Sequence, residues 1–229
     1  VLAADDLDPA KLPALLDEVR QALKDEDLDA RHVRIASATV RMINRVPDDD
    51  LAAKSYKEFG EMWSKSDDQE LSAYGRRIAK GTRPPSLVGK PLEIAGTTLD
   101  GAKFDLAEYK GKVVVVDFWA TWCGPCRAAL PGLMKTYERF HSQGFEVVGV
   151  SLDSDLDALG KFLDENKLPW INLMGEKDGD DLKFPLAEKY EIQAIPSMFL
   201  VGKDGKVIGR DLSEKELEKK LEELVGGNK

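Results

Sequence analysis

The stretch VVVVDFWATWCGPC, residues 113–126, decides the fold class of this 229-residue chain. Its first seven residues are apolar except for Asp117. A continuous run of this kind is typical of a strand that is buried on both faces of a sheet. Pro125, between the two cysteines, suits the first turn of a helix, where a backbone N–H is not needed. The stretch therefore predicts a central strand, a short turn and a helix that begins at about Cys123.

Cys123 and Cys126 are the only cysteines in the chain. A thiol at a helix start lies near unpaired backbone N–H groups and the positive end of the helix dipole, and both favour the thiolate. The two intervening residues leave Cys126 within disulfide reach of Cys123. Such a pair exchanges disulfides when Cys123 attacks a substrate disulfide and Cys126 then attacks the Cys123 sulfur, which releases the reduced substrate.

Two other uses of a Cys-x-x-Cys pair stay open from the residues alone. Tetrahedral zinc takes four ligands, or three and a water, and His32 and His141 are the only histidines that could join the cysteines, with carboxylates as further options. The second use is a structural disulfide, although proteins that depend on disulfides for their stability have more cysteines, spaced to close larger loops. We expect neither of them, and we expect no metal ion and no cofactor.

Four features together resemble the thioredoxin superfamily. The first is the segment Val115–Cys126 itself, VVDFWATWCGPC. Pro131 lies five residues after the second cysteine, where thioredoxins kink the active-site helix. Ile195-Pro196 precedes a predicted strand, as the cis-proline of the family does, and Asp117 occupies the position of thioredoxin's buried acid. The resemblance implies a thioredoxin-like fold, which is a central mixed sheet flanked by helices.

The resemblance covers about residues 87–225. Within it, a hairpin at 92–106 and an extra helix and strand near 155–174 are similar to the TlpA/ResA-like branch, whose members are usually extracytoplasmic. This branch implies a thiol-disulfide oxidoreductase that reduces protein disulfides through a mixed disulfide. The implied partners are protein disulfide substrates and an upstream thiol donor.

The resemblance also implies a role for each matching residue. Cys123 is the nucleophile, Cys126 the resolving thiol, and Asp117 a buried proton acceptor for Cys126. A cis peptide before Pro196 leaves the backbone around Ile195 free to pair with an extended substrate segment. The residues expected on the substrate side are Trp122, Gly124, Pro125 and Ile195.

The chain departs from the pattern at three positions. TlpA/ResA-like proteins often carry a glutamate three residues after the second cysteine, where this chain has Ala129. Many of them lack an acid at the position of Asp117. Thioredoxin pairs its acid with a lysine on the next strand, and our alignment places Gly149 there. Asp117 is therefore expected to lack that cationic partner, which should raise its pKa.

Outside the central stretch, strands alternate with helices from residue 87 onward, which predicts an α/β layer structure. Asp100-Gly101 marks a hairpin turn, and Ser213 with Glu216 forms a capping box for the last helix. The predicted strands are 92–99, 103–106, 113–119, 145–152, 170–174, 197–201 and 206–210, and the predicted helices are 123–141, 155–166, 182–190 and 214–225.

Residues 8–81 show helical periodicity and no strand pattern, which predicts a small all-α domain of about four helices. Asp8-Pro9 starts the first, Asp29 the second and Asp48 the third, and Asp67 with Glu70 suggests a capping box for the fourth. Thr82–Ser86 reads as a proline-containing linker. We therefore predict a helical domain over 1–84, which could bind a partner, and a thioredoxin-like domain over 85–229.

The net charge and the distribution of apolar residues argue against two classes of function. The net charge is −9, and the absence of a basic stripe argues against nucleic-acid binding. No run of about 18 apolar residues is present, so we predict no transmembrane segment in this chain. Val1–Ala4 resembles the end of a secretory signal peptide and could equally be the start of a truncated chain. The first interpretation predicts an extracytoplasmic protein, and the alternative is a cytoplasmic one.

Two rival functions stay open from the sequence. The segment before the cysteines also resembles thiol peroxidases of the peroxiredoxin type, which place proline and threonine at set positions before the reactive cysteine. Residues 117–122 supply no such proline. The other rival, from a different class, is an interaction module whose redox domain is a tethered passenger.

Overall fold

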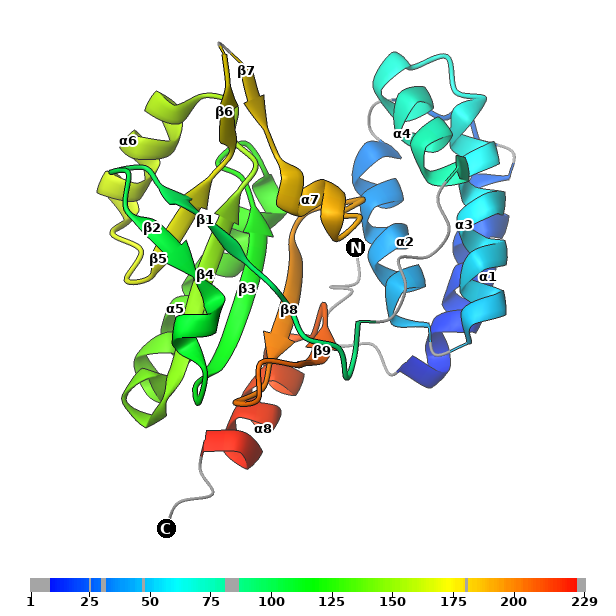
Figure 1. Cartoon of the computed structure of the whole chain (residues 1–229). Coiled ribbons are helices and arrows are strands. Elements are labelled where there is room, and N and C mark those ends of the chain that lie inside the picture. Colours follow the sequence, from blue (N-terminus) through cyan, green and yellow to red (C-terminus); the bar gives the residue numbers. More distant parts are fainter. Residues whose placement is uncertain are drawn as a thin grey trace. The chain divides into compact units, whose positions relative to one another are not determined.

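The computed structural model describes residues 9–24, 26–29, 32–46, 48–80, 87–179 and 181–225. The chain divides into two compact units, Val1–Ser86 and Leu87–Lys229. Figure 1 shows helices in the first unit and a sheet flanked by helices in the second. The predicted signal-peptide end at Val1–Ala4, the cap at Asp8 and the linker at 82–86 lie outside the described residues.

Two aspartates begin helices of the first unit. Asp48 accepts the backbone N–H of Leu51 at 2.9 Å and caps the third helix, as predicted. The predicted capping box of the fourth helix is wrong by one residue, because Asp68 rather than Asp67 accepts the N–H of Leu71, at 2.8 Å. The described helices of this unit are α1 (Leu12–Leu23), preceded by the 3₁₀ turn Pro9–Lys11, α2 (Val33–Arg45), α3 (Asp49–Ser64) and α4 (Gln69–Lys80).

The second helix begins later than predicted. It starts at Val33 rather than near Asp29, because His32 closes a turn in which its Nδ1 accepts the backbone N–H of Asp29 at 3.1 Å. The Nδ1 atom of His32 is therefore engaged in a hydrogen bond within this local turn.

Large apolar side chains fill the core of the helical unit, and two glycines let α3 and α4 pack closely. A Cβ at Gly60 of α3 would lie 2.4 Å from the backbone nitrogen of Ala79 in α4. A Cβ at Gly75 would lie 2.3 Å from the backbone nitrogen of Ser64. The fully buried side chains around this contact are Tyr56, Phe59, Trp63, Leu71 and Ile78.

We expect Gly75→Ala to lower the free energy of unfolding by about 1–3 kcal/mol, because backbone atoms cannot move aside and the two helices must separate. Urea unfolding followed by circular dichroism measures the change. Gly160→Ala is the matched control, since the atom nearest to its Cβ is Cδ2 of the Leu99 side chain, at 3.1 Å. A Gly75→Ala protein as stable as the parent would contradict the close helix contact.

A seven-stranded mixed sheet organises the second unit, in the order β2-β1-β5-β4-β3-β8-β9. Strands β3, β4 and β5 are parallel, and the other neighbours are antiparallel. The fully buried strand predicted from the central stretch is confirmed, and it lies between β4 and β8. The strands of the sheet are β1 (Ala95–Thr98), β2 (Lys103–Asp105), β3 (Val113–Trp119), β4 (Phe145–Ser151), β5 (Ile171–Met174), β8 (Ser197–Val201) and β9 (Val207–Arg210).

Helices cover both faces of this sheet. Odd-numbered residues of β3, Val113 and Val115, pack with Leu130 and Leu133 of α5 (Gly124–Phe140) and with α8 (Glu214–Val225). Even-numbered residues of β3 pack on the other face, against the 3₁₀ helix Leu106–Tyr109 and α7 (Pro185–Lys189). The predicted α/β class with a mixed central sheet, preceded by a helical region, is confirmed.

Two predicted elements need correction. Residues 92–94 are not a strand, so the first hairpin begins at Ala95, although its turn lies at Asp100-Gly101 as predicted. The predicted helix at 182–190 is wrong in its first part, where β6 (Glu176–Asp178) and β7 (Asp181–Lys183) form a hairpin. Helix α7 begins at Pro185, because proline fits the first helical position and not the interior.

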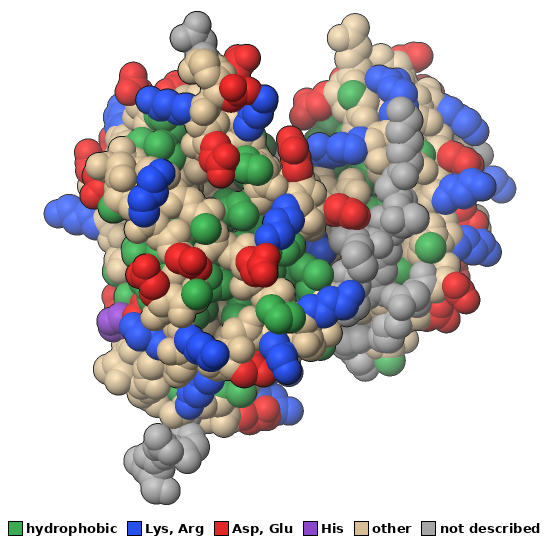
Figure 2. Space-filling view, in the orientation of Figure 1, with side chains coloured by type: hydrophobic (Ala, Val, Ile, Leu, Met, Phe, Trp, Pro, Cys, Tyr) green, Lys and Arg blue, Asp and Glu red, His purple; other side chains and the backbone are tan. Residues whose placement is uncertain are grey.

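Charges are mixed on the molecular surface. On the face drawn in Figure 2, acidic and basic side chains are interspersed and form no continuous basic stripe. None of the described helices has the length and apolar character needed to cross a membrane.

Candidate active site

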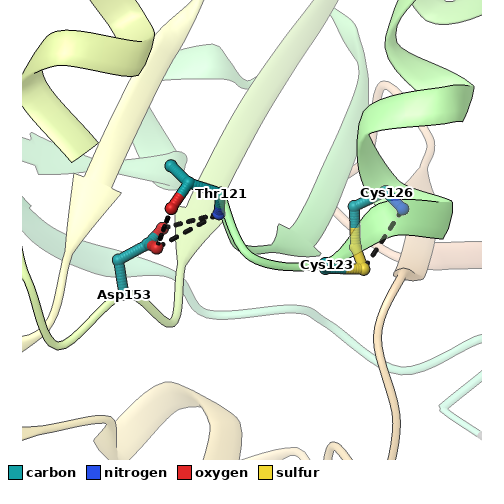
Figure 3. The surroundings of a disulfide bond; sticks show 4 residues. All are labelled: Thr121, Cys123, Cys126 and Asp153. Atoms are coloured by element: carbon teal, nitrogen blue, oxygen red, sulfur yellow. Dashed lines mark hydrogen bonds between the residues drawn. A yellow bond between two sulfur atoms is a disulfide. The ribbon is translucent and has the colours of Figure 1, made fainter. Parts of the chain in front are cut away.

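Cys123 is the residue that caps the N-terminus of α5, and it forms a disulfide with Cys126 in the first helical turn. The backbone N–H of Cys126 donates a hydrogen bond to Cys123 Sγ at 3.1 Å (Figure 3). In the reduced protein, the same N–H and the helix dipole would stabilise a thiolate on Cys123. Both cysteines are buried, and Cys123, at 5% exposed, is slightly more accessible than Cys126, at 2%.

The residues predicted to face substrate lie around this disulfide. Trp122 is 67% exposed, and Gly124 and Pro125 are also exposed. Ile195 comes from a distant part of the chain and packs against the cluster that contains both cysteines. Its peptide bond to Pro196 is cis, as the resemblance implied. The fold therefore gathers these residues at one place.

Asp117 lies on β3 with Val115 and Trp119, the residues whose side chains face α5. It is 7% exposed, and its Oδ1 has no hydrogen-bond partner among the described residues. Burial raises the pKa of this carboxyl to about 7, and the negative charge of Asp211 adds to the rise. The carboxyl is therefore poised to exchange a proton near neutral pH.

Asp117 and Gly149 are register partners on β3 and β4, so the residue beside Asp117 on β4 carries no charge. The amide of Asn172 fills the space beside Gly149, where a Cβ would lie only 2.1 Å from Asn172 Oδ1. That oxygen accepts the indole N–H of Trp119 at 3.1 Å. A neutral hydrogen bond thus lies beside Gly149, the position where the resemblance to thioredoxin implied a lysine.

His141 lies too far from the cysteines to join them as a zinc ligand. His141 follows the last residue of α5, so about 25 Å of helix separates it from Cys123. Within the described ranges, no group of three or more histidine, cysteine, aspartate or glutamate side chains is arranged to hold a metal ion.

Comparison with known proteins agrees with this geometry. The model of the Redoxin family matches residues 79–225, which is more than half of the chain. This chain belongs to the redoxin family. It is 31% identical over 137 residues to the thiol-disulfide oxidoreductase ResA of Bacillus thuringiensis subsp. konkukian, which covers 56% of this chain and 70% of that protein. ResA of Bacillus subtilis is 32% identical over 131 residues, with 57% and 66% covered.

Solved structures give the same result. The thioredoxin domain of a thiol-disulfide oxidoreductase from Bacteroides vulgatus superposes with a TM-score of 0.54 and 34% identity, covering 60% of this chain and 97% of that one. A structure titled as a putative thiol:disulfide interchange protein DsbE from Chlorobium tepidum has a TM-score of 0.54 and 27% identity, covering 62% and 99%. The chain is therefore a TlpA/ResA-like thiol-disulfide oxidoreductase with a Cys-x-x-Cys redox centre.

A buried residue that no sequence motif marks, Asp153, holds the active-site loop of this redoxin. Asp153 follows β4 and is 2% exposed. Its carboxylate accepts the backbone N–H of Thr121 at 3.0 and 3.1 Å and the Thr121 hydroxyl at 2.5 Å (Figure 3). It also accepts the Ser151 hydroxyl at 2.8 Å. Asp153 thus ties the loop before Cys123 to the end of β4.

We expect Asp153→Asn to lower the free energy of unfolding by about 2 kcal/mol, because the amide NH₂ cannot accept the bonds that the second carboxylate oxygen makes. Insulin reduction should slow as well, since the loop loses its anchor. Asp155→Asn is the matched control, because asparagine caps α6 (Leu156–Asn166) as well as aspartate does. Equal stability of the Asp153 and Asp155 variants would show that the Thr121 bonds contribute little.

Proposed function

We propose that this redoxin reduces protein disulfides, with Cys123 as the nucleophile and Cys126 as the resolving thiol. The observation that carries the proposal is the hydrogen bond from the Cys126 N–H to Cys123 Sγ at the start of α5. The Cys123 thiolate attacks a substrate sulfur, forms a mixed disulfide and releases one substrate thiolate. Cys126 loses its proton, attacks Cys123 Sγ and releases the second substrate thiolate, so the enzyme ends oxidised and the substrate reduced.

Insulin reduction by dithiothreitol tests this function, with hydrogen peroxide consumption measured in parallel. We expect the protein to accelerate insulin precipitation and to consume peroxide no faster than free dithiothreitol does. Rapid peroxide consumption without insulin reduction would favour the thiol peroxidase instead.

Substrate binding is proposed for the surface formed by Trp122, Gly124, Pro125 and Ile195, next to the cis-proline Pro196. The exposed Trp122 supports this proposal, because a large aromatic side chain beside a reactive sulfur offers apolar contact area to an unfolded or extended segment. Asp117 is proposed as the proton acceptor for Cys126. Its burial on the face of β3 toward α5, together with its raised pKa, supports that role.

The helical domain, residues 1–84, is proposed to be separable from the redox domain, residues 85–229, and to carry no redox chemistry. The division of the chain between Ser86 and Leu87 supports this proposal. A chain that begins at Ser86 should unfold cooperatively and keep insulin reductase activity within roughly twofold of the full chain. An unfolded product would mean that the two parts share a core. Pull-downs with each part alone would show whether the helical domain is an interaction module.

An extracytoplasmic location, with an upstream thiol donor, is proposed from the TlpA/ResA-like membership. Fractionation of cells that produce the native protein from its own gene tests this location. Recovery in the cytoplasmic fraction would support the alternative.

A further inference from the structure

The geometry points to Asp211 as a positioning residue that controls proton uptake by Asp117 and anchors the strand after Pro196. This inference rests on the proposed role of Asp117 as proton acceptor and deepens it. Asp211 lies directly after β9, 94 positions from Asp117 in the sequence, and nothing in the sequence marks it.

The sheet brings the two acids together through Met198. Asp117 on β3 and Met198 on β8 are antiparallel register partners. Asp211 exchanges two hydrogen bonds with the same Met198: its N–H donates to the Met198 carbonyl at 2.8 Å, and its Oδ1 accepts the Met198 N–H at 2.7 Å. Oδ1 also accepts the Ser197 hydroxyl at 3.1 Å. Asp211 therefore holds the two residues that directly follow Pro196.

A purely structural role for Asp211 is also conceivable. Its side chain replaces the carbonyl that a longer β9 would offer to Met198, and its φ of +50° suits an aspartate or asparagine at the end of a strand. That role needs one acceptor oxygen and no charge. The second carboxylate oxygen indicates a role beyond this one. The Asp211 side chain is 6% exposed, and its buried Oδ2 has no hydrogen-bond partner among the described residues.

The charges around the pair do not balance. Arg210 faces Asp211, with 3.5 Å between Nε and Oδ2, and donates to the Ser197 hydroxyl at 3.3 Å. On the other side β4 presents Gly149, and the Asn172 amide from β5 is neutral. On the helices, Arg127 lies over the Phe162 ring, Glu216 bonds Ser213, and the Glu214 carboxylate lies against Gly132.

The Arg210 guanidinium thus pairs with Asp211, and among the described residues no cation pairs with Asp117. Asp211 has the guanidinium and the Met198 N–H as partners, whereas Asp117 has a buried Oδ1 with no hydrogen-bond partner among the described residues. Burial and the negative charge of Asp211 raise the pKa of Asp117 to about 7, so Asp117 is the carboxyl that takes up a proton near neutral pH. The charge of Asp211 makes the Asp117 carboxylate a stronger base toward the Cys126 thiol. During resolution the ionised Asp117 carboxylate takes the Cys126 proton, the Cys126 sulfur bonds to Cys123 Sγ as the bond from Cys123 to the substrate sulfur breaks, and the substrate thiolate leaves and is protonated by water.

Asp211→Asn separates the two roles, because asparagine keeps the acceptor oxygen and tolerates the positive φ but removes the charge. We expect the pH profile of single-turnover resolution to move down by roughly one pH unit in the full-length protein. The carboxyl titration of Asp117, followed by ¹³C NMR in the oxidised protein, should move in the same direction. Arg210→Gln removes the cation and should move both upward.

The outcomes separate this inference from the proposed function. Profiles for Asp211→Asn and Arg210→Gln that superimpose on the parent, while Asp117→Asn alters the profile, would reduce Asp211 to a strand cap and leave Asp117 as the acceptor. An Asp117→Asn profile identical to that of the parent would overturn the acceptor and the inference together. If Asp211→Asn does not fold, the upward shift in Arg210→Gln still decides the matter, and its absence would overturn the inference.

Discussion

Cys123→Ser should abolish insulin reduction, to below roughly one thousandth of the parent rate, because the reactive sulfur at the start of α5 is lost. Cys126→Ser should also stop turnover, but after the first step. The nucleophile remains in that variant and the resolving thiol is missing, so a mixed disulfide with the substrate accumulates on Cys123. Mass spectrometry of the non-reduced, digested adduct identifies the linked cysteine.

The double variant lacking both thiols is the control and should form no adduct. Reductase activity retained in Cys123→Ser, or a substrate adduct on Cys126 in that variant, would reverse the assignment of the two roles. An adduct on Cys123 that turns over without Cys126 would remove the need for a resolving thiol.

Asp117→Asn should slow resolution of the mixed disulfide by roughly 10²-fold near neutral pH, because the side chain keeps its shape and loses the ability to take the Cys126 proton. The initial attack by Cys123 should change less, and the rise of the resolution rate around pH 7 should disappear. Single-turnover kinetics over pH 5–9 measures both steps. Glu146→Gln is the control, since Glu146 is a buried carboxylate on β4 that pairs with Lys112.

Asp117→Asn should also change how the free energy of unfolding depends on pH. The pKa of Asp117 is raised to about 7 in the folded protein, so between pH 4 and pH 7 the folded state binds a proton that the unfolded state has lost. Stability of the parent therefore falls as pH rises through this window, by about 4 kcal/mol in total. Asp117→Asn should lack this fall and should be the more stable protein above pH 7. Parallel stability curves for both proteins would show that Asp117 is not held in a low-dielectric site.

The central strand and the active-site helix could be predicted closely because their signals are local. An unbroken apolar run specifies β3, and the proline and cysteines specify the start of α5. The helix predicted over 182–190 was wrong at its start because that prediction also rested on a local pattern. Leu182, Leu186 and Tyr190 recur at helical spacing, although the first of them lies on a short, polar strand of the β6–β7 hairpin.

Asp153 and Asp211 could not be recognised from the sequence, because an aspartate after a strand looks like an ordinary turn residue. Their partners come from other segments: Thr121 is 32 positions from Asp153, and Met198 is 13 positions from Asp211. The role of Gly75 could not be recognised from the sequence either, because it depends on the close approach of the Ser64 backbone in α3 to α4. Such contacts become visible only when the register of the strands and the packing of the helices are known.

The central claim is that the Cys123–Cys126 disulfide is a redox couple and not a structural bond. Equilibration of the full chain with dithiothreitol buffers, followed by alkylation and mass determination, tests it most directly. We predict a reversible two-electron transition at a potential between roughly −180 and −300 mV, the range in which proteins exchange disulfides with one another. A disulfide that stays closed in excess dithiothreitol without denaturant would contradict the account.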